Sequence, residues 1–178
     1  MGILYKCRKY LNQSTLLTLY NAFIYPYFNY CIAVWGNTYD SYLKPLITLQ
    51  KRAVRIIANA AFRDDTEPLF KKLKILSISK LHTYFVQLFV FNYNNELLPE
   101  IFRDFFVGNS SIHDHFTRQV DNLHVPIFRL SQSYRTVRCF GVKTFNYFLT
   151  RIRMNCTYCT YKRHLKHYLI NNVIPFPV

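Results

Sequence analysis

The chain has 178 residues, the length of one ordinary domain or two small ones, and is long enough to bury a core without disulfides. Its residues are 51% hydrophobic and 18% aromatic, so the composition excludes a disordered tail. A formal net charge of +14 favours an anionic partner, with nucleic acid as the first candidate and an anionic membrane as the second.

The first predicted elements are helices in an uncharged run from Leu11 to Tyr39. Ser14 is a suitable N-cap for a helix through "TLLTLYNAFIY", in which hydrophobic residues recur at helical spacing. Pro26 is expected to kink or end this helix, and a second segment follows to about Trp35. A membrane span is the alternative, but the polar residues of the run and Pro26 favour a packed helical core.

The most regular predicted element is a helix from about Tyr42 to Ala60, which follows a turn over Gly36–Tyr42 and a cap at Asp40 or Ser41. Its hydrophobic residues and Gln50 are expected on one face, and cations on an opposite, exposed face. The cations are Lys44, Lys51, Arg52 and Arg55.

Two more helices are expected in the middle of the chain. One runs from Thr66 or Glu67 to Lys74, and Ser77 caps the other, a long aromatic helix through "ISKLHTYFVQLFVFNYNN". Residues 107–132 are polar and rich in turn-forming residues, which predicts an ordered loop or linker.

The C-terminal part is expected to contain a small β element. In Ser133–Phe140 two sets of side chains alternate along the chain, a weak signal for a strand. A short helical run follows through Phe148, and a last helix spans about Thr157–Ile170. The predicted fold class is therefore mainly α. We expect a helical domain over 1–106, a linker over 107–132 and a basic α/β extension over 133–178.

Asp64 and Asp65 resemble the paired carboxylates with which polymerases hold metal ions. A two-metal site also needs a further acid from another strand, whereas here a basic helix precedes the pair and "TEPLFKKL" follows it. We interpret the pair as an exposed turn in which Asp65 or Thr66 caps the next helix.

No other motif predicts a catalytic residue, a metal site or a cofactor. The sequence has four glycines and no Gly-x-Ser-x-Gly, and His113-Asp114-His115 is interpreted as a surface cluster in a loop. The last helix carries a possible zinc set, but one zinc ion would not be reached by all four side chains without breaking that helix. The set is Cys156, Cys159, His164 and His167.

The five cysteines are odd in number and irregularly spaced, and no secretory signal is recognised near Met1. These features favour reduced thiols and an intracellular location, nuclear or cytoplasmic, and argue against secretion.

The strongest positive signal is the uneven charge. Residues 1–63 contain eight Lys or Arg against Asp40 alone, and residues 117–178 contain ten against Asp121 alone. Cations projecting together can contact successive phosphates, although a solvated basic face is the plainer alternative. The expected nucleic-acid-binding residues are Lys44, Lys51, Arg52 and Arg55 in the first block, and Arg135, Arg138, Arg151, Arg153, Lys162, Arg163 and Lys166 in the second.

Three segments of the sequence resemble a known protein family: "YPYFNYCIAVWGNT", "LQKRAVRII" and "TEPLFKKLKIL". The chain resembles the segment after the palm in reverse transcriptases of non-LTR (LINE-type, jockey-like) retrotransposons. The shorter words "LPEIF", "NSSIHDHFTRQVDNLHVP", "GVKTFNYF" and "YKRHLKHYL" follow in the family's order. The chain departs from the family at Phe145-Asn146, where Trp-Asn is usual.

The resemblance implies a helical thumb over the first part of the chain, followed by a C-terminal extension. Such a thumb lies against the template–primer duplex, while the metal-binding acids, which would hold Mg, belong to a palm without a counterpart here. The chain is therefore expected to bind nucleic acid without catalysing polymerisation, and the missing palm and fingers are possible partners. The alternatives are a non-enzymatic interaction module, an inert decayed reading frame or a small membrane protein.

Overall fold

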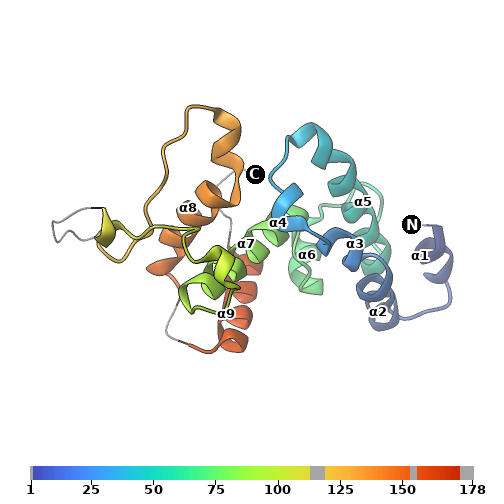
Figure 1. Cartoon of the computed structure of the whole chain (residues 1–178). Coiled ribbons are helices and arrows are strands. Elements are labelled where there is room, and N and C mark those ends of the chain that lie inside the picture. The colour runs from blue at the N-terminus through green and yellow to red at the C-terminus, as the bar shows by residue number, and fades with distance from the viewer. Residues whose placement is uncertain (1, 113–118, 153–155, 173–178) are drawn as a thin grey trace. The chain divides into compact units, whose positions relative to one another are not determined.

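The computed structural model describes residues 2–112, 119–152 and 156–172, and these residues are mainly helical, which confirms the predicted fold class (Figure 1). They form two compact units. Unit 1 comprises residues 2–82 with the end of the last helix from Leu169, and unit 2 comprises residues 83–168. The contact boundary lies inside the helix Ile78–Asn94 (α7), well before the boundary at residue 106 expected from the sequence. The division into a helical domain over 1–106, a linker over 107–132 and an extension over 133–178 stays a prediction.

Unit 1 begins with four helices separated by short turns: α1 (Gly2–Cys7), α2 (Gln13–Phe23), α3 (Tyr25–Asn29) and α4 (Ile32–Trp35). The cap of α2 is Asn12, whose Oδ1 accepts a hydrogen bond from the Thr15 backbone N–H at 2.9 Å, so the cap predicted at Ser14 was two residues too late. Pro26 lies in the first turn of α3, where it needs no intrahelical donor, and the predicted break of the helix is confirmed.

The long helix α5 (Asp40–Ala58) begins two residues before its predicted start, and Asp40 is its first residue rather than its cap. The N-cap position is held by Tyr39 without a side-chain hydrogen bond. At the other end Asn59 adopts the left-handed conformation (φ 55°) and its backbone N–H caps the helix, as Asn often does. α2 and α5 pack side by side in unit 1 (Figure 1).

Gln50 joins three segments in the core of unit 1. Its side chain is 1% exposed, and its Nε2 donates to the Tyr20 hydroxyl at 3.1 Å and to the Leu76 carbonyl at 2.9 Å. Its Oε1 accepts a hydrogen bond from the Ile78 backbone N–H, at 3.0 Å, at the start of α7. Burial raises the pKa of Tyr20 to about 12, so this hydroxyl stays protonated and can donate or accept at any physiological pH.

Gly36 lies where α4 ends against α7. A Cβ at this position would be 2.5 Å from the Ile32 carbonyl oxygen and 2.8 Å from Cδ2 of His82. The glycine that follows Trp35 is therefore required because there is no room for a side chain. Trp35, at the end of α4, donates its indole N–H to the carbonyl of Tyr30 at 2.6 Å, in the turn that precedes α4. The close packing of the His82 side chain against the end of α4 therefore depends on glycine.

His82 is expected to make unit 1 sensitive to acid. Its side chain is 1% exposed, and burial lowers its pKa from 6.5 to about 4, although a hydrogen bond with the Ala33 backbone opposes this shift. The unfolded chain therefore binds the proton more readily, and stability is lost as the pH falls from 6.5 to 4. The contribution is about 3 kcal/mol, to be measured by denaturant unfolding at pH 7 and pH 4. His82→Gln should remove this part of the pH dependence, whereas His164→Gln at an exposed position should leave it unchanged.

Unit 2 packs its second long helix, α8 (Val137–Leu149), against α7, and α9 (Tyr158–Asn171) follows close to its predicted range. Val90, Val142 and Phe145 belong to one buried cluster, and Phe91 stacks on Tyr161 with ring centroids 4.1 Å apart. Gly141 lets α8 approach α7, because a Cβ there would lie 3.2 Å from Val90.

The strand predicted over Ser133–Phe140 is wrong. This segment is a 3-10 turn (η3, Ser131–Arg135) followed by the first turn of α8, because residues from Val137 onward bury one helical face. Strand pairing among the described residues is limited to a single antiparallel bridge between Gly108 and Leu123. Asn146 of α8 holds this bridge by accepting from the Leu123 N–H at 3.0 Å and donating to its carbonyl at 2.8 Å.

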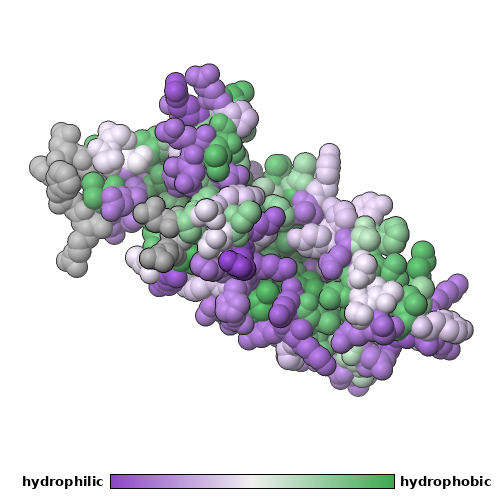
Figure 2. Space-filling model, turned by 90° about the horizontal axis from the view of Figure 1, so that it is seen from below, coloured by the Kyte–Doolittle hydropathy of each residue, from purple (hydrophilic) through white to green (hydrophobic). Residues whose placement is uncertain are grey.

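Apolar side chains also lie at the surface, where Figure 2 shows them interspersed with hydrophilic ones. In unit 1 they include Phe23, Tyr27, Tyr30 and Val34, which are 68–82% exposed. None of the described helices combines the length and the apolar character needed to cross a membrane. The uncharged run Leu11–Tyr39 is divided among α2, α3 and α4.

Candidate nucleic-acid interface

The basic face of α5 consists of Lys44, Lys51, Arg52 and Arg55, which the helix places on one side as the sequence predicts. Lys44, Lys51 and Arg52 are exposed and Arg55 is half-buried. With a rise of about 1.5 Å per residue, the face extends for about 16 Å from Lys44 to Arg55. This length is enough for several successive phosphates of one strand.

Carboxylates of the described residues do not neutralise these cations. Among those residues the one ion pair joins Arg103 to Glu100 at 3.3 Å in unit 2, and both of its side chains are exposed. Arg55 donates from Nε to the Asp64 backbone carbonyl at 3.0 Å, a contact that orients the guanidinium without cancelling its charge. The basic face is therefore positively charged as well as accessible.

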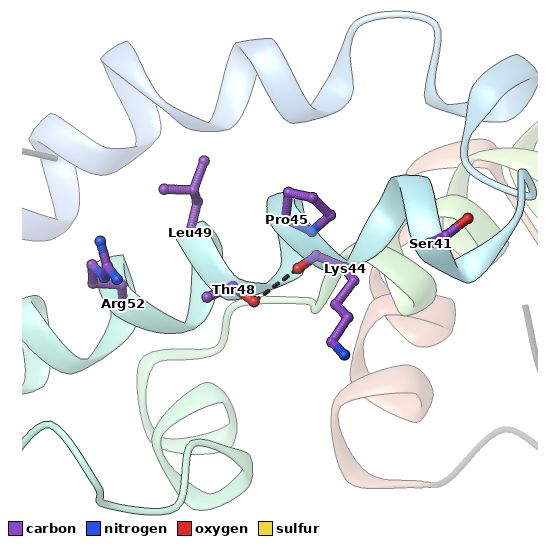
Figure 3. A pocket seen from close by; sticks show the side chains of 6 residues that line it. All are labelled: Ser41, Lys44, Pro45, Thr48, Leu49 and Arg52. Atoms are coloured by element: carbon purple, nitrogen blue, oxygen red, sulfur yellow. Dashed lines mark hydrogen bonds between the residues drawn. The ribbon is translucent and has the colours of Figure 1, made fainter.

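A shallow hollow of about 430 Å³ runs along the exposed side of α5 (Figure 3). Lys44 and Leu49 extend from opposite sides of the helix, so the hollow has a charged side and an apolar side. Thr48 donates its hydroxyl to the Lys44 backbone carbonyl at 2.8 Å within the helix, and the Lys44 side chain is exposed (Figure 3). An extended polyanion fits such a surface better than a small molecule does, because small-molecule sites enclose their ligand.

Arg52 and Arg55 also line a second hollow of about 310 Å³, between α1 and the C-terminal end of α5. Arg8, Tyr5 and Phe62 are among its other lining residues, and the sequence patterns did not predict a role for any of the three. Arg8 is brought there by donating its Nε–H to the side chain of Asn59, which lies 51 residues away in the chain. The one feature of the sequence that could have indicated this role of Arg8 is the short basic run around it, just before α2.

The cations predicted in the C-terminal block have different surroundings. Arg138 donates to the Phe105 carbonyl at 3.3 Å, and Arg151 donates to the Tyr147 carbonyl at 2.7 Å with its guanidinium 3.7 Å from the Tyr147 ring centroid. Both arginines are exposed, and these contacts hold their side chains against unit 2. Arg135 is half-buried in η3, and Arg153 lies outside the described residues. The exposed face of α9 carries the remaining three, Lys162, Arg163 and Lys166.

The acidic pair forms a turn, as the sequence predicts. Asp64 accepts a hydrogen bond from the Ala61 N–H at 2.7 Å, and Asp65 accepts one from the Glu67 N–H at 3.3 Å. Both carboxylates are exposed, and α6 (Glu67–Leu73) begins directly after them. Thr66 is the N-cap residue by position but makes no side-chain cap hydrogen bond, so the cap is supplied by Asp65.

Within the described parts of the chain no three His, Cys, Asp or Glu side chains are grouped so that they could hold a metal ion. Cys156 precedes α9 and Cys159 lies in its first turn, with an exposed thiol. His164 and His167 are exposed farther along the same helix. The His113-Asp114-His115 cluster lies outside the described residues.

No family model, curated protein or solved structure matches this chain. The resemblance to non-LTR reverse transcriptases therefore rests on the quoted sequence segments alone, and what it implies stays a proposal.

Proposed function

We propose that this chain binds nucleic acid through the basic face of α5, as the thumb-like part of a retrotransposon reverse transcriptase that grips the template–primer. The observation that carries the proposal is the exposed row Lys44, Lys51, Arg52 on one helix, which no described carboxylate pairs, with Arg55 continuing it. The charged face of α9 is a second contact region in the same proposal.

The arrangement of the adjacent residues Gln50, Lys51 and Arg52 supports the proposal. Gln50 is directed into the core and fixes α5 against α2 and α7, while the next two residues, Lys51 and Arg52, are directed outward. Core packing thus sets the orientation of the contact residues. In this proposal the chain holds the nucleic acid and contributes no catalytic group, and the metal-dependent chemistry belongs to a palm with its own carboxylates.

A salt titration tests the proposal. The affinity of the 178-residue chain for a labelled duplex oligonucleotide should fall steeply with salt, because each phosphate contact releases condensed counterions. The logarithm of the association constant should decrease linearly with the logarithm of the salt concentration. Absence of binding at low salt, or an affinity that does not depend on salt, would contradict the proposal.

Replacing Lys51, Arg52 and Arg55 together by alanine is expected to weaken duplex binding at least tenfold at low salt. It should also reduce the salt slope by about 2 to 3 units, since each lost phosphate contact removes about 0.9 from the slope. The matched control replaces Lys71, Lys72 and Arg129, which are exposed and carry the same total charge. Equal losses in both variants would show that only net charge matters and that α5 is not the contact face.

A protein-interaction role is the second candidate, favoured by the exposed side chains Phe23, Tyr27, Tyr30 and Val34 in unit 1. It predicts concentration-dependent self-association or aggregation of the chain without affinity for nucleic acid. Sedimentation of the chain over a range of concentrations, with and without the oligonucleotide, separates the two candidates.

A further inference from the structure

The hollow between α1 and α5 differs from the one along the basic face of α5 in being less open to solvent. Its volume of about 310 Å³ is at the lower end of the range for small-molecule sites, about 300–1,000 Å³. Its walls come from three places in the chain: α1, the last turns of α5 and the turn after α5. The α1–α5 hollow therefore has room for one nucleotide unit and not for a duplex.

Three arginines line the α1–α5 hollow: Arg8, Arg52 and Arg55. Two of them are oriented by their Nε atoms, Arg8 by the Asn59 side chain and Arg55 by the Asp64 carbonyl. Their Nη groups have no hydrogen-bond partner among the described residues. A guanidinium held in this way offers a planar pair of donors, which matches the oxygens of a phosphate.

The nearest acid does not occupy these donors. The Asp64 carboxylate is held by the Ala61 N–H at 2.7 Å and forms no ion pair with an arginine among the described residues. The three cations thus line one hollow without forming an ion pair with a described carboxylate, and an anion bound there would reduce their mutual repulsion.

Two aromatic side chains flank the arginines. Tyr5 is 62% exposed and Phe62 is 75% exposed, and both line the α1–α5 hollow. Exposed rings beside a row of cations are the arrangement with which proteins stack unpaired bases while holding the adjacent phosphate. A phosphorylated peptide would use the arginines but would leave both rings without a matching group.

We propose that the α1–α5 hollow binds a single unpaired nucleotide of a nucleic-acid strand. Arg8, Arg52 and Arg55 hold its phosphate, and Tyr5 and Phe62 stack on its base. The inference rests on the proposed function and sharpens it: a single strand, or a strand end frayed from a duplex, is bound at the α1 end of α5. Lys44 and Lys51, which do not line the hollow, contact the neighbouring phosphates.

The test replaces the two rings by alanine in the full chain, which leaves the charge unchanged. Tyr5→Ala/Phe62→Ala should weaken binding of a short labelled single-stranded oligonucleotide at least tenfold, since base–aromatic stacking is worth about 1–3 kcal/mol per base. The salt slope and the affinity for a blunt duplex should change little. The matched control, Tyr27→Ala/Tyr30→Ala, removes two exposed rings outside the hollow and should have no effect.

A second measurement does not depend on the variants folding. An oligonucleotide containing 5-iodouracil, irradiated with the unaltered chain, should crosslink to Tyr5 or Phe62, as identified by mass spectrometry. Crosslinks confined to other residues, or equal losses of single-strand and duplex affinity in the ring variant, would overturn the inference while leaving the proposed function intact. A phosphoserine peptide that displaces the single strand from the hollow at equal concentration would also overturn it. If the unaltered chain binds neither single-stranded nor duplex nucleic acid, the proposed function itself is refuted.

Discussion

Replacing Gln50 by alanine is expected to lower the free energy of unfolding by about 3 to 5 kcal/mol. The substitution leaves the Leu76 carbonyl and the Ile78 N–H buried without their partner. It also leaves a cavity where a side chain that is 1% exposed had been packed. The measurement is equilibrium denaturation by urea, followed by circular dichroism.

Two controls define the origin of this loss. Tyr20→Phe removes only the hydrogen bond between the phenol and Gln50 and should cost about 1 kcal/mol. Thr48→Ala, at an exposed position of the same helix, should change stability by less than about 0.5 kcal/mol. If Gln50→Ala is no worse than Thr48→Ala, the amide network does not hold α2, α5 and α7 together.

The same residue links stability to the proposed contact surface. The orientation of α5 about its own axis decides whether Lys51 and Arg52 are directed outward, and the three hydrogen bonds of Gln50 fix that orientation. A partly folded Gln50→Ala protein should therefore lose the difference between the α5 variant and its charge-matched control, even where some helical content remains.

The sequence predicts the helices of this chain well where one face is uniformly apolar. In α5 the spacing of Leu43, Val54 and Ile57 settles which side is buried, and the basic face follows by exclusion. Helix ends are predicted less well, because several short polar residues near a boundary can serve as caps. At α2 the choice lies between Asn12 and Ser14, and only the backbone conformation decides for Asn12.

The strand predicted over Ser133–Phe140 shows where periodicity is ambiguous. Over eight residues, alternation can coincide with the start of a helical pattern, and the buried set of α8 becomes evident only farther on, at Phe140, Thr144 and Phe148. A longer window, weighted toward the residues after Gly141, would have favoured the helix.

The α1–α5 hollow could not be predicted from the sequence, because its members are distant in the chain. Arg8 and Asn59 meet only because α1 packs against α2 and α5. Arg52 and Arg55 were predicted as part of the basic face of α5. That they also line the α1–α5 hollow depends on the packing of α1 beside them. Local sequence patterns identify the charged surface, whereas the hollow is created by tertiary packing.

Replacing Gly36 by alanine is expected to lower the free energy of unfolding by about 2 to 4 kcal/mol, because the added methyl group has no room. Its Cβ would be 2.5 Å from the Ile32 carbonyl oxygen, 2.8 Å from Cδ2 of His82 and 2.9 Å from its Cβ. The backbone conformation is not the cause, since φ is −71° and alanine adopts it readily. Alanine also restricts the unfolded chain, which would by itself stabilise the protein. The loss therefore measures two steric contacts together, one with the last turn of α4 at Ile32 and one with the His82 side chain of α7.

The other glycines supply a graded control, measured by the same urea titration. A methyl group added at Gly2 would meet no atom within 4 Å, so Gly2→Ala should leave stability unchanged or raise it slightly. The stability loss in Gly141→Ala should lie between those of Gly2→Ala and Gly36→Ala, because its nearest neighbours are side-chain methyl groups of Val90 and Val86 at 3.2 and 3.3 Å, which can shift.

Combining Gly36→Ala with His82→Ala should cost less stability than the sum of the two single losses, since removal of the imidazole relieves one of the contacts. Additive losses, or equal effects at Gly2 and Gly36, would show that the two helices are not in this close contact.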